Sequence, residues 1–272
     1  MTLPHDGTAG LQRARQHGHV DDEGRPSDSV GQAWAGKTIP VQGFADDRGD
    51  ADPGVITALR SCAGHPTPDA EVELMARVAV ARWLVPVVAV PTEVDETGGL
   101  VTDTRSEMAA VVLTAPDGRR ALPMFTSLES LAAWDPEARP VPVPASSAAQ
   151  SAITESCDAL LVDVSSPHAV VLRASMLWAL AQDRPWLPAH LDDHVARAIR
   201  AAVADEPFVA AHRVEAGEPL GAGVLRVVLE LPSGLDEPAV SALATRVGER
   251  IATDGEARAR IDALTFALEA AT

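Results

Sequence analysis

The chain has 272 residues, of which 46% are hydrophobic and 3% aromatic, and its formal net charge is −17. This length allows one large domain or two ordinary domains. The acidity is spread along the chain and argues against nucleic-acid binding and against anionic membrane surfaces, because both need a basic face. No apolar run is long enough to span a membrane, and the first residues lack the basic and apolar regions of a signal peptide. We therefore expect a cytoplasmic protein that binds neither nucleic acid nor membrane.

Residue usage points to a bacterial source and to a reducing compartment. Lysine occurs once and asparagine not at all, which is typical of GC-rich bacterial genes. The two cysteines, Cys62 and Cys157, lie far apart and lack the spacing of a redox or zinc site. We expect them to be free cytosolic thiols, although a disulfide between them stays open at this point.

The first 33 residues are polar and show neither the helical nor the strand apolar period, so they are predicted to be a disordered tail. From Trp34 onward the composition changes. The apolar side chains of Trp34, Ile39, Val41 and Phe44 are expected to anchor an arm onto the main domain.

Residues 31–38, GQAWAGKT, match the phosphate-loop pattern letter for letter. That chemistry also needs a strand before the loop and a helix after it, so that the backbone N–H groups are aimed at the phosphates. A polar segment precedes this loop, and Pro40 follows it within the first turn. We therefore predict that Lys37 binds no nucleotide, and we expect no cofactor.

Apolar periodicity predicts a helix over residues 69–82 and then a buried strand over 83–90. Pro86 inside that strand cannot donate a ladder hydrogen bond, which predicts an edge strand or a bulge. Glu107–Ala115 and Arg119–Phe125 flank Pro116-Asp117-Gly118, and this arrangement predicts a hairpin.

The stretch from Ala121 to Pro144 combines a strand, a capped helix and a second strand. Thr126 and Glu129 have the spacing of a capping box. Leu128, Leu131 and Trp134 then follow on one helical face, so Trp134 is expected in the core.

This unit resembles the SseB-like family (enhanced serine sensitivity proteins), whose members share a strand that ends in Phe-Thr-Ser and runs into a short helix. A Trp-x-Gly element and a Phe-x-x-Asp-x-Gly loop of that family are matched by Trp34, Gly36, Phe44, Asp47 and Gly49. The resemblance covers residues 34–182 best and suggests an actinobacterial-type member. It implies no established molecular function.

After this unit the sequence predicts further elements of the same domain and then a second domain. The first set comprises a helix over 146–155, strands over 158–164 and 169–172, and a helix over 174–182. The second set comprises a helix with Val195, Ile199 and Val203, strands over 208–215 and 224–231, a helix from Asp236, and a strand over 263–268. We predict an α+β (mixed α/β) protein with a tail (1–33), an SseB-like domain (34–182) and a small β-β-α-β C-terminal domain (183–272), in which one helix covers the sheet.

Two acidic or histidine-rich segments are weighed as metal sites and set aside. His190 and His194 lie four residues apart, but a helix that begins near His190 would leave His190 at or before its cap, and so not on the face of His194. Asp46–Asp52 has the acidity of a calcium loop without its spacing. Asp52-Pro53 is better explained as the start of a helix. We predict no metal site.

The sequence contains no nucleophile elbow, paired thiols or dinucleotide fingerprint. We therefore expect a non-catalytic binding or regulatory module; the alternative is a small-metabolite enzyme whose site is built from loops. The predicted binding surface is the mouth around Phe125, Thr126 and Ser127, together with Trp134. Exposed N–H groups at a helix start there would hold a small anionic ligand, unless Thr126 satisfies those donors itself, and the other expected partner is an unidentified protein.

Overall fold

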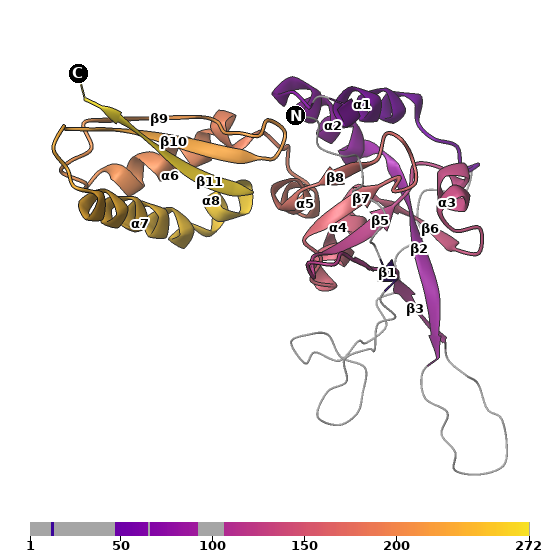
Figure 1. The fold of residues 1–272 in the computed structure, drawn as a ribbon. Helices are drawn as coiled ribbons and strands as arrows, with labels where there is room; N and C mark the ends of the chain where they lie inside the picture. Colours follow the sequence, from indigo (N-terminus) through magenta and orange to yellow (C-terminus); the bar gives the residue numbers. More distant parts are fainter. Residues whose placement is uncertain (1–11, 14–46, 65, 92–105, 272) are drawn as a thin grey trace, which may run out of the picture.

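The computed structural model describes residues 12–13, 47–64, 66–91 and 106–271. Over these residues the protein is a mixed α+β structure, as predicted, and its elements form two bodies (Figure 1). The predictions for Lys37 and for the Trp34–Phe44 arm lie outside the described residues. Of the predicted tail, only Gln12–Arg13 is described, as a short strand, which the sequence did not lead us to expect. None of the described helices is long and apolar enough to cross a membrane.

The N-terminal body carries two sheets with helices around them. Its elements are β1 (Gln12–Arg13), α1 (Pro53–Gly64), α2 (Pro68–Val80), β2 (Arg82–Pro91), β3 (Ser106–Ala110), β4 (Leu113–Thr114), β5 (Arg120–Met124), α3 (Leu128–Trp134), β6 (Arg139–Pro144), α4 (Ala145–Thr154), β7 (Ala159–Val162), β8 (Val170–Leu172) and α5 (Ala174–Ala181). The five-stranded sheet has the order β1-β4-β5-β7-β8, and the three-stranded sheet has the order β3-β2-β6.

Side chains from α1, α2, α4 and α5 pack with strand residues into one core. Helix α4 places four buried alanines on its inner face, at positions 145, 148, 149 and 152, and such small side chains let a helix approach its neighbours closely. Trp83 is completely buried, and its indole N–H donates to the carbonyl of Val78 at 3.1 Å. The core therefore accommodates a large aromatic ring with its polar atom satisfied.

Strand β2 is central in its sheet, so the prediction that Pro86 marks an edge or a bulge is wrong. On one side β2 pairs with β6. On the other side Leu84 pairs with Phe125, the carbonyl of Pro86 accepts from the N–H of Val111, and from Val87 onward the partner is β3. Pro86 thus lies where the partner of β2 changes from Phe125 to β3, so its missing N–H costs no regular ladder hydrogen bond.

The predicted hairpin turn is confirmed, but its first strand is divided between two sheets. Gly118 has a positive φ of 86°, and its N–H donates to the carbonyl of Ala115 at 2.9 Å. Instead of one strand over 107–115, β3 pairs with β2 while β4 pairs with β5. The apolar pattern is continuous across this change of sheet, so it carries no sign of the break.

Helix α3 begins one residue later than predicted. Its cap is Ser127, which forms a capping box with Ser130, in place of Thr126 with Glu129. The hydroxyl of Thr126 is engaged elsewhere, because it donates to Asp163 Oδ2 at 2.7 Å. A long-range contact therefore overrides the local spacing.

The C-terminal body contains η1 (Ala189–Leu191), α6 (Asp193–Val203), β9 (Ala211–Ala216), β10 (Val224–Leu231), α7 (Glu237–Thr253), α8 (Gly255–Arg260) and β11 (Ala263–Ala270). The sheet order is β11-β10-β9, with β10 and β11 parallel. The bounds predicted for β10 are confirmed, whereas β9 begins at Ala211 and not at residue 208. The predicted single covering helix is wrong, because both α6 and α7 contribute buried side chains to the core under this sheet.

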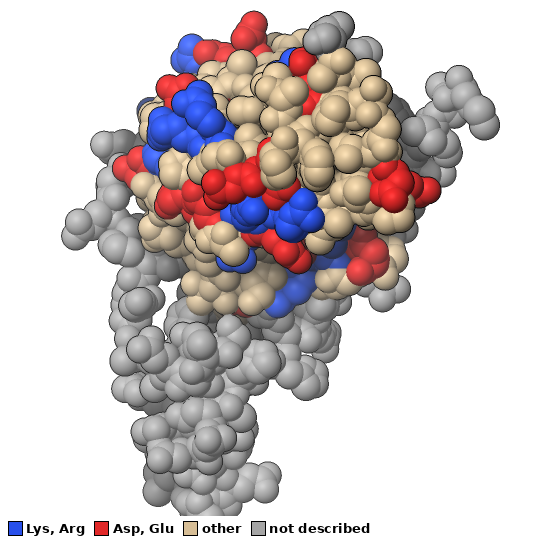
Figure 2. Space-filling view, turned by 90° about the vertical axis from the view of Figure 1, so that its left-hand side faces the viewer, with Lys and Arg blue, Asp and Glu red and all other residues tan. Residues whose placement is uncertain are grey.

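The opposite face of this sheet is polar. Arg213 of β9 binds Glu269 of β11 through both nitrogens of its fork, at 2.8 and 2.5 Å, across Val228 of β10. Figure 2 looks onto the C-terminal body and shows acidic and basic side chains adjoining one another over its surface. The two bodies have separate cores, while the domain limits at residues 33 and 182 stay predictions.

Candidate functional site

Two of the predicted binding residues, Phe125 and Trp134, form an aromatic contact. Phe125 is completely buried and exchanges both backbone hydrogen bonds with Leu84, at 2.9 Å each. The ring of Trp134 lies 5.3 Å from that of Phe125, tilted by 32°, and is partly buried. Both side chains thus belong to a small apolar cluster beneath α3.

The other two predicted binding residues, Thr126 and Ser127, have protein partners. The N–H of Thr126 donates to Asp163 Oδ1 at 2.9 Å, and its carbonyl accepts from Arg82 at 3.0 Å. The N–H of Leu128 donates to the carbonyl of Gly49 at 2.8 Å, and Ser127 caps Ser130. These donors, which would have to hold an anion, are engaged in the structure. Binding at this mouth stays a prediction, and its geometry favours a structural role.

The acidic loop that precedes α1 is likewise engaged in the fold. Arg82 binds Asp47 at 2.5 Å and the carbonyl of Asp50 at 2.7 Å. Asp52 accepts from the N–H groups of Gly54 and Val55, as expected of a residue at a helix start. The loop is therefore held by a guanidinium and a helix cap.

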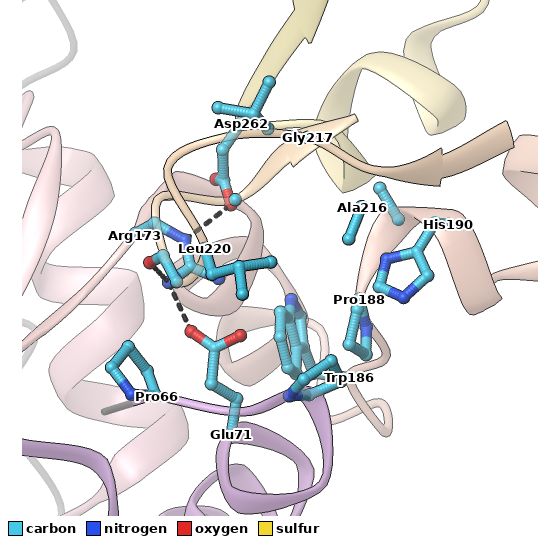
Figure 3. A pocket seen from close by; sticks show the side chains of 15 residues that line it. Pro66, Glu71, Arg173, Trp186, Pro188, His190, Ala216, Gly217, Leu220 and Asp262 are labelled. Carbon is cyan, nitrogen blue, oxygen red and sulfur yellow. Dashed lines mark hydrogen bonds and ion pairs between the residues drawn. The ribbon is translucent and has the colours of Figure 1, made fainter. Parts of the chain in front are cut away.

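A hollow between the two bodies gathers polar groups that the sequence did not bring together. Glu71 of α2, Arg173 before α5, His190 of η1 and Asp262 before β11 line it, with Trp186 and several prolines and glycines as the remaining walls (Figure 3). Its volume is about 40 Å³. At roughly 10–15 Å³ per water this is room for about three waters, and far too little for a nucleotide.

Arg173 is the centre of this site. Its Nη1 binds Glu71 Oε1 at 2.6 Å and the carbonyl of Gly221 at 2.8 Å, and its Nε binds Asp262 Oδ2 at 2.9 Å. Its guanidinium lies 5.8 Å from the centre of the Trp186 ring. One side chain of the N-terminal body therefore holds a carboxylate from each body.

Asp262 also completes a helix of the other body. Its Oδ1 accepts from the N–H of Ser175 at 2.7 Å, and its Oδ2 accepts from the Ser175 hydroxyl at 2.8 Å. The residue before α5, Arg173, forms no side-chain cap of its own. The hydroxyl of Ser175 in turn accepts from the Trp186 indole at 3.0 Å. A carboxylate from the C-terminal body thus caps α5.

The loop between β9 and β10 reaches this site because it carries glycines. Gly221 and Gly223 have positive φ values of 80° and 73°. A Cβ at Gly221 would overlap Pro66, and one at Gly223 would overlap both Arg173 and Asp262. Only glycine combines this backbone conformation with such a close approach.

The hollow brings one guanidinium, that of Arg173, against two carboxylates, those of Glu71 and Asp262. Burial lowers the pKa of His190, although nearby Glu71 opposes the shift, so this imidazole is neutral at pH 7. Burial alone would lower the pKa of Arg173, but its bonds to Glu71 and Asp262 outweigh this effect and raise it. The arrangement can join the two bodies and hold a few waters or a small polar group. The nearby hydroxyl of Ser175 donates to Asp262 and accepts from the Trp186 indole.

The cysteines and the other histidine of interest, His194, form no reactive or metal-binding cluster among the described residues. Both thiols are free, and burial raises the pKa of Cys62 to about 11 and that of Cys157 to about 12. His190 lies in η1, before the Asp192 cap of α6, as predicted, and the imidazole of His194 faces Asp254 at 3.4 Å. Within the described residues, no group of three potential ligands is placed to hold a metal ion.

Comparison with family models matches residues 56–179 to the SseB protein N-terminal domain. This part of the chain is an SseB-like domain. The matched SseB-like domain runs from α1 to α5 and contains Glu71 and Arg173, whereas Asp262 lies outside it. Searches of curated proteins and of solved structures gave no match.

Sequence reasoning missed the Arg173 site because its partners are 102 and 89 residues away. One signal was present. Arg173 is the only charged residue between His168 and Asp183, in an otherwise apolar stretch. A lone arginine in such a stretch is expected to find a buried partner.

Proposed function

We propose that this SseB-like protein is a non-catalytic binding module that takes an extended segment of a protein partner along β11. The carrying observation is the outer edge of that strand. Strand β11 is eight residues long, and no described strand pairs with its second side. A regular edge strand of this length is a ready template for another strand.

The hydrogen-bond pattern identifies the groups that this edge offers. The N–H of Ala271 donates to the carbonyl of Leu231 in β10, so odd-numbered residues of β11 face β10. By alternation, the N–H and C=O groups of Leu264, Phe266, Leu268 and Ala270 point outward. An added strand would satisfy these groups.

Two other sheet edges of the molecule are protected. In β6, Val141 and Val143 face β2, so the nitrogens of Pro140, Pro142 and Pro144 point outward and offer no donor. In β9, His212, Arg213 and Glu215 place polar side chains along six residues. Strand β11 has one charged residue, Glu269, in eight. Prolines and charges are the usual means of blocking strand addition, and β11 has no proline and only this one charge.

The Arg173 site favours this role over catalysis, because its groups are bonded to one another. A small-metabolite enzyme remains the second candidate, supported by the neutral imidazole of His190 near Glu71. A small anionic ligand at Ser127 has less support, since the donors there are engaged. The free thiols support a cytoplasmic location.

Affinity capture with the full chain from its own lysate tests the proposal. Leu268→Pro removes one outward N–H and leaves the ladder to β10 intact, so we expect loss of the captured protein. The matched control is His212→Pro, which removes an outward N–H from β9. Equal capture by both variants and the wild type would reject the β11 edge as the binding surface. Substrate turnover that is lost in His190→Ala would instead support the enzyme.

A further inference from the structure

We propose that the segment which binds β11 is β11 of a second copy of this chain, paired antiparallel about a two-fold axis. The two three-stranded sheets would then form one continuous six-stranded sheet. This inference rests on the proposed function, because it names the occupant of the same edge. It requires that the edge be complementary to itself in hydrogen bonding, in apolar contacts and in charge.

Hydrogen bonding meets this requirement. In an antiparallel pair, the residues that exchange backbone bonds stand directly opposite each other. The outward groups of β11 belong to even-numbered residues, so the allowed registers place even residues opposite even residues. With Phe266 opposite Phe266 of the second copy, Leu264 stands opposite Leu268 in both halves. The same donors and acceptors are thereby used on each chain.

The side chains of those residues are apolar and share one face. Leu264, Phe266 and Leu268 are aligned with Leu225, Val227 and Leu229 of β10, whose side chains are buried on the helix side. Phe266 reaches α7 at Gly248, where an added Cβ would lie 3.8 Å from the ring. Leu268 is 46% exposed. Pairing would join two such rows into one and remove this leucine from water.

The opposite face creates no charge conflict. In the same register Glu269 stands opposite Ala263 of the second copy, and Thr265 opposite Ala267. Glu269 is already bonded to Arg213 within its own chain. The edge therefore needs no basic residue from outside, which favours a second copy over a positively charged segment of another protein.

The net negative charge of the chain opposes this pairing and makes it depend on salt. Each chain carries a net charge of −17, so two copies repel each other at low ionic strength. Salt screens this repulsion over about 8 Å at physiological ionic strength. Self-pairing through an apolar edge should therefore strengthen as salt is added, whereas binding of a basic segment should weaken.

Sedimentation velocity on the full chain is the primary test. We expect the mass to rise from 28.4 kDa toward twice that value with increasing protein concentration, and the shift to occur at lower concentration in higher salt. Leu268→Pro should stay monomeric with an unchanged circular dichroism spectrum, while His212→Pro and Leu268→Ala should still associate. A wild-type chain that is monomeric at every concentration, or a dimer that His212→Pro and Leu268→Pro weaken equally, overturns the proposal.

Amide hydrogen exchange gives a second measurement in case Leu268→Pro fails to fold. In the wild type, the amides of Leu264, Phe266 and Leu268 should exchange slowly at high protein concentration and rapidly at low concentration. Rapid exchange at both concentrations contradicts self-pairing. If the chain is monomeric but Leu268→Pro still abolishes capture of another protein, the second copy is wrong and the binding edge stands. If that variant alters neither behaviour, both proposals fail.

Discussion

The SseB-like domain and the C-terminal body differ in the exposed edges of their sheets. In the N-terminal part, β8 is an edge strand of only three residues and the edge of β6 is blocked by prolines. The C-terminal body has one sheet with helices on one face, an ion-paired open face and the unblocked strand β11. The matched domain thus has short or blocked sheet edges, whereas the part beyond it has the unblocked edge that we propose for binding.

The polar groups of the two parts also differ, because those of the SseB-like domain fix loops whereas those of the C-terminal sheet lie on an exposed face. In the SseB-like domain, Arg82 and Asp163 bind backbone and side-chain groups that fix loops. In the C-terminal body, Arg213 and Glu269 form an ion pair that is nearly half exposed. Since exposed ion pairs contribute little to stability, truncations should have large effects in the first part and small ones on the open face.

The largest expected effect is on the core of the SseB-like domain. Trp83→Ala removes a completely buried indole together with its bond to Val78 and should lower the free energy of unfolding by about 3–5 kcal/mol. Denaturant unfolding measures it. The control is Trp178→Ala, whose indole is 40% exposed. Similar losses for both variants would contradict the core assignment.

The next effect tests the connection between the two parts. Asp262→Ala leaves Arg173 with one carboxylate and α5 without its cap, and should cost about 2–3 kcal/mol. Proteolysis should then cut the segment between α5 and α6, residues 182–192, faster. Glu269→Ala removes an exposed carboxylate from a comparable ion pair and serves as control, with no measurable change expected. If protease cuts this segment no faster in Asp262→Ala than in the wild type, the two bodies are held together by other contacts.

Trp134→Ala should have an intermediate effect. Its ring is only partly buried against Phe125, so we expect a loss of about 1–2 kcal/mol, below the value for a fully buried aromatic side chain. Denaturant unfolding is again the measurement. An unchanged denaturant midpoint of unfolding would contradict the packing role and make Trp134 a candidate for partner binding.

The fourth prediction concerns acid stability of the C-terminal body. Burial alone would raise the pKa of Asp192, but bonds from Arg260 and from the N–H groups of His194 and Val195 lower it below the ordinary value of 3.8. The ionised form therefore stabilises the fold above that value, and this stability is lost as the pH falls through the lower, folded-state pKa. Asp192→Asn, which can still cap α6, should lose about 1 kcal/mol at neutral pH and depend less on pH in acid. Parallel acid-unfolding curves for the two proteins would contradict this.

The smallest effect is expected from removal of residues 1–33. This polar segment contains too little apolar surface to contribute much to a core, although Gln12–Arg13 pair with β4. The melting temperature should change by less than about 2 °C. A larger fall would mean that the N-terminal segment stabilises the five-stranded sheet.

Local patterns predicted those features that local chemistry determines. The helix start at Asp52-Pro53, the turn at Gly118 and the bounds of β10 follow from caps, turn residues and apolar runs. The sequence failed where a distant group decides the outcome. Asp163 takes the hydroxyl of Thr126 and shifts a helix cap by one residue, and β2 finds successive neighbours around Pro86. The Arg173 site and the open edge of β11 depend on tertiary pairing, which periodicity does not contain.

The cap of α5 by Asp262 also has a consequence for synthesis of the chain. Ser175 is made 87 residues before the carboxylate that binds its N–H and hydroxyl. While the chain is growing, the SseB-like domain can collapse early, since domains fold as units from the N-terminus. Its last helix nevertheless stays incomplete at its start until residue 262 has left the ribosome. A chain stalled before residue 262 would carry a folded first domain with a frayed α5, which gives quality-control proteases a physical means of telling truncated molecules from finished ones.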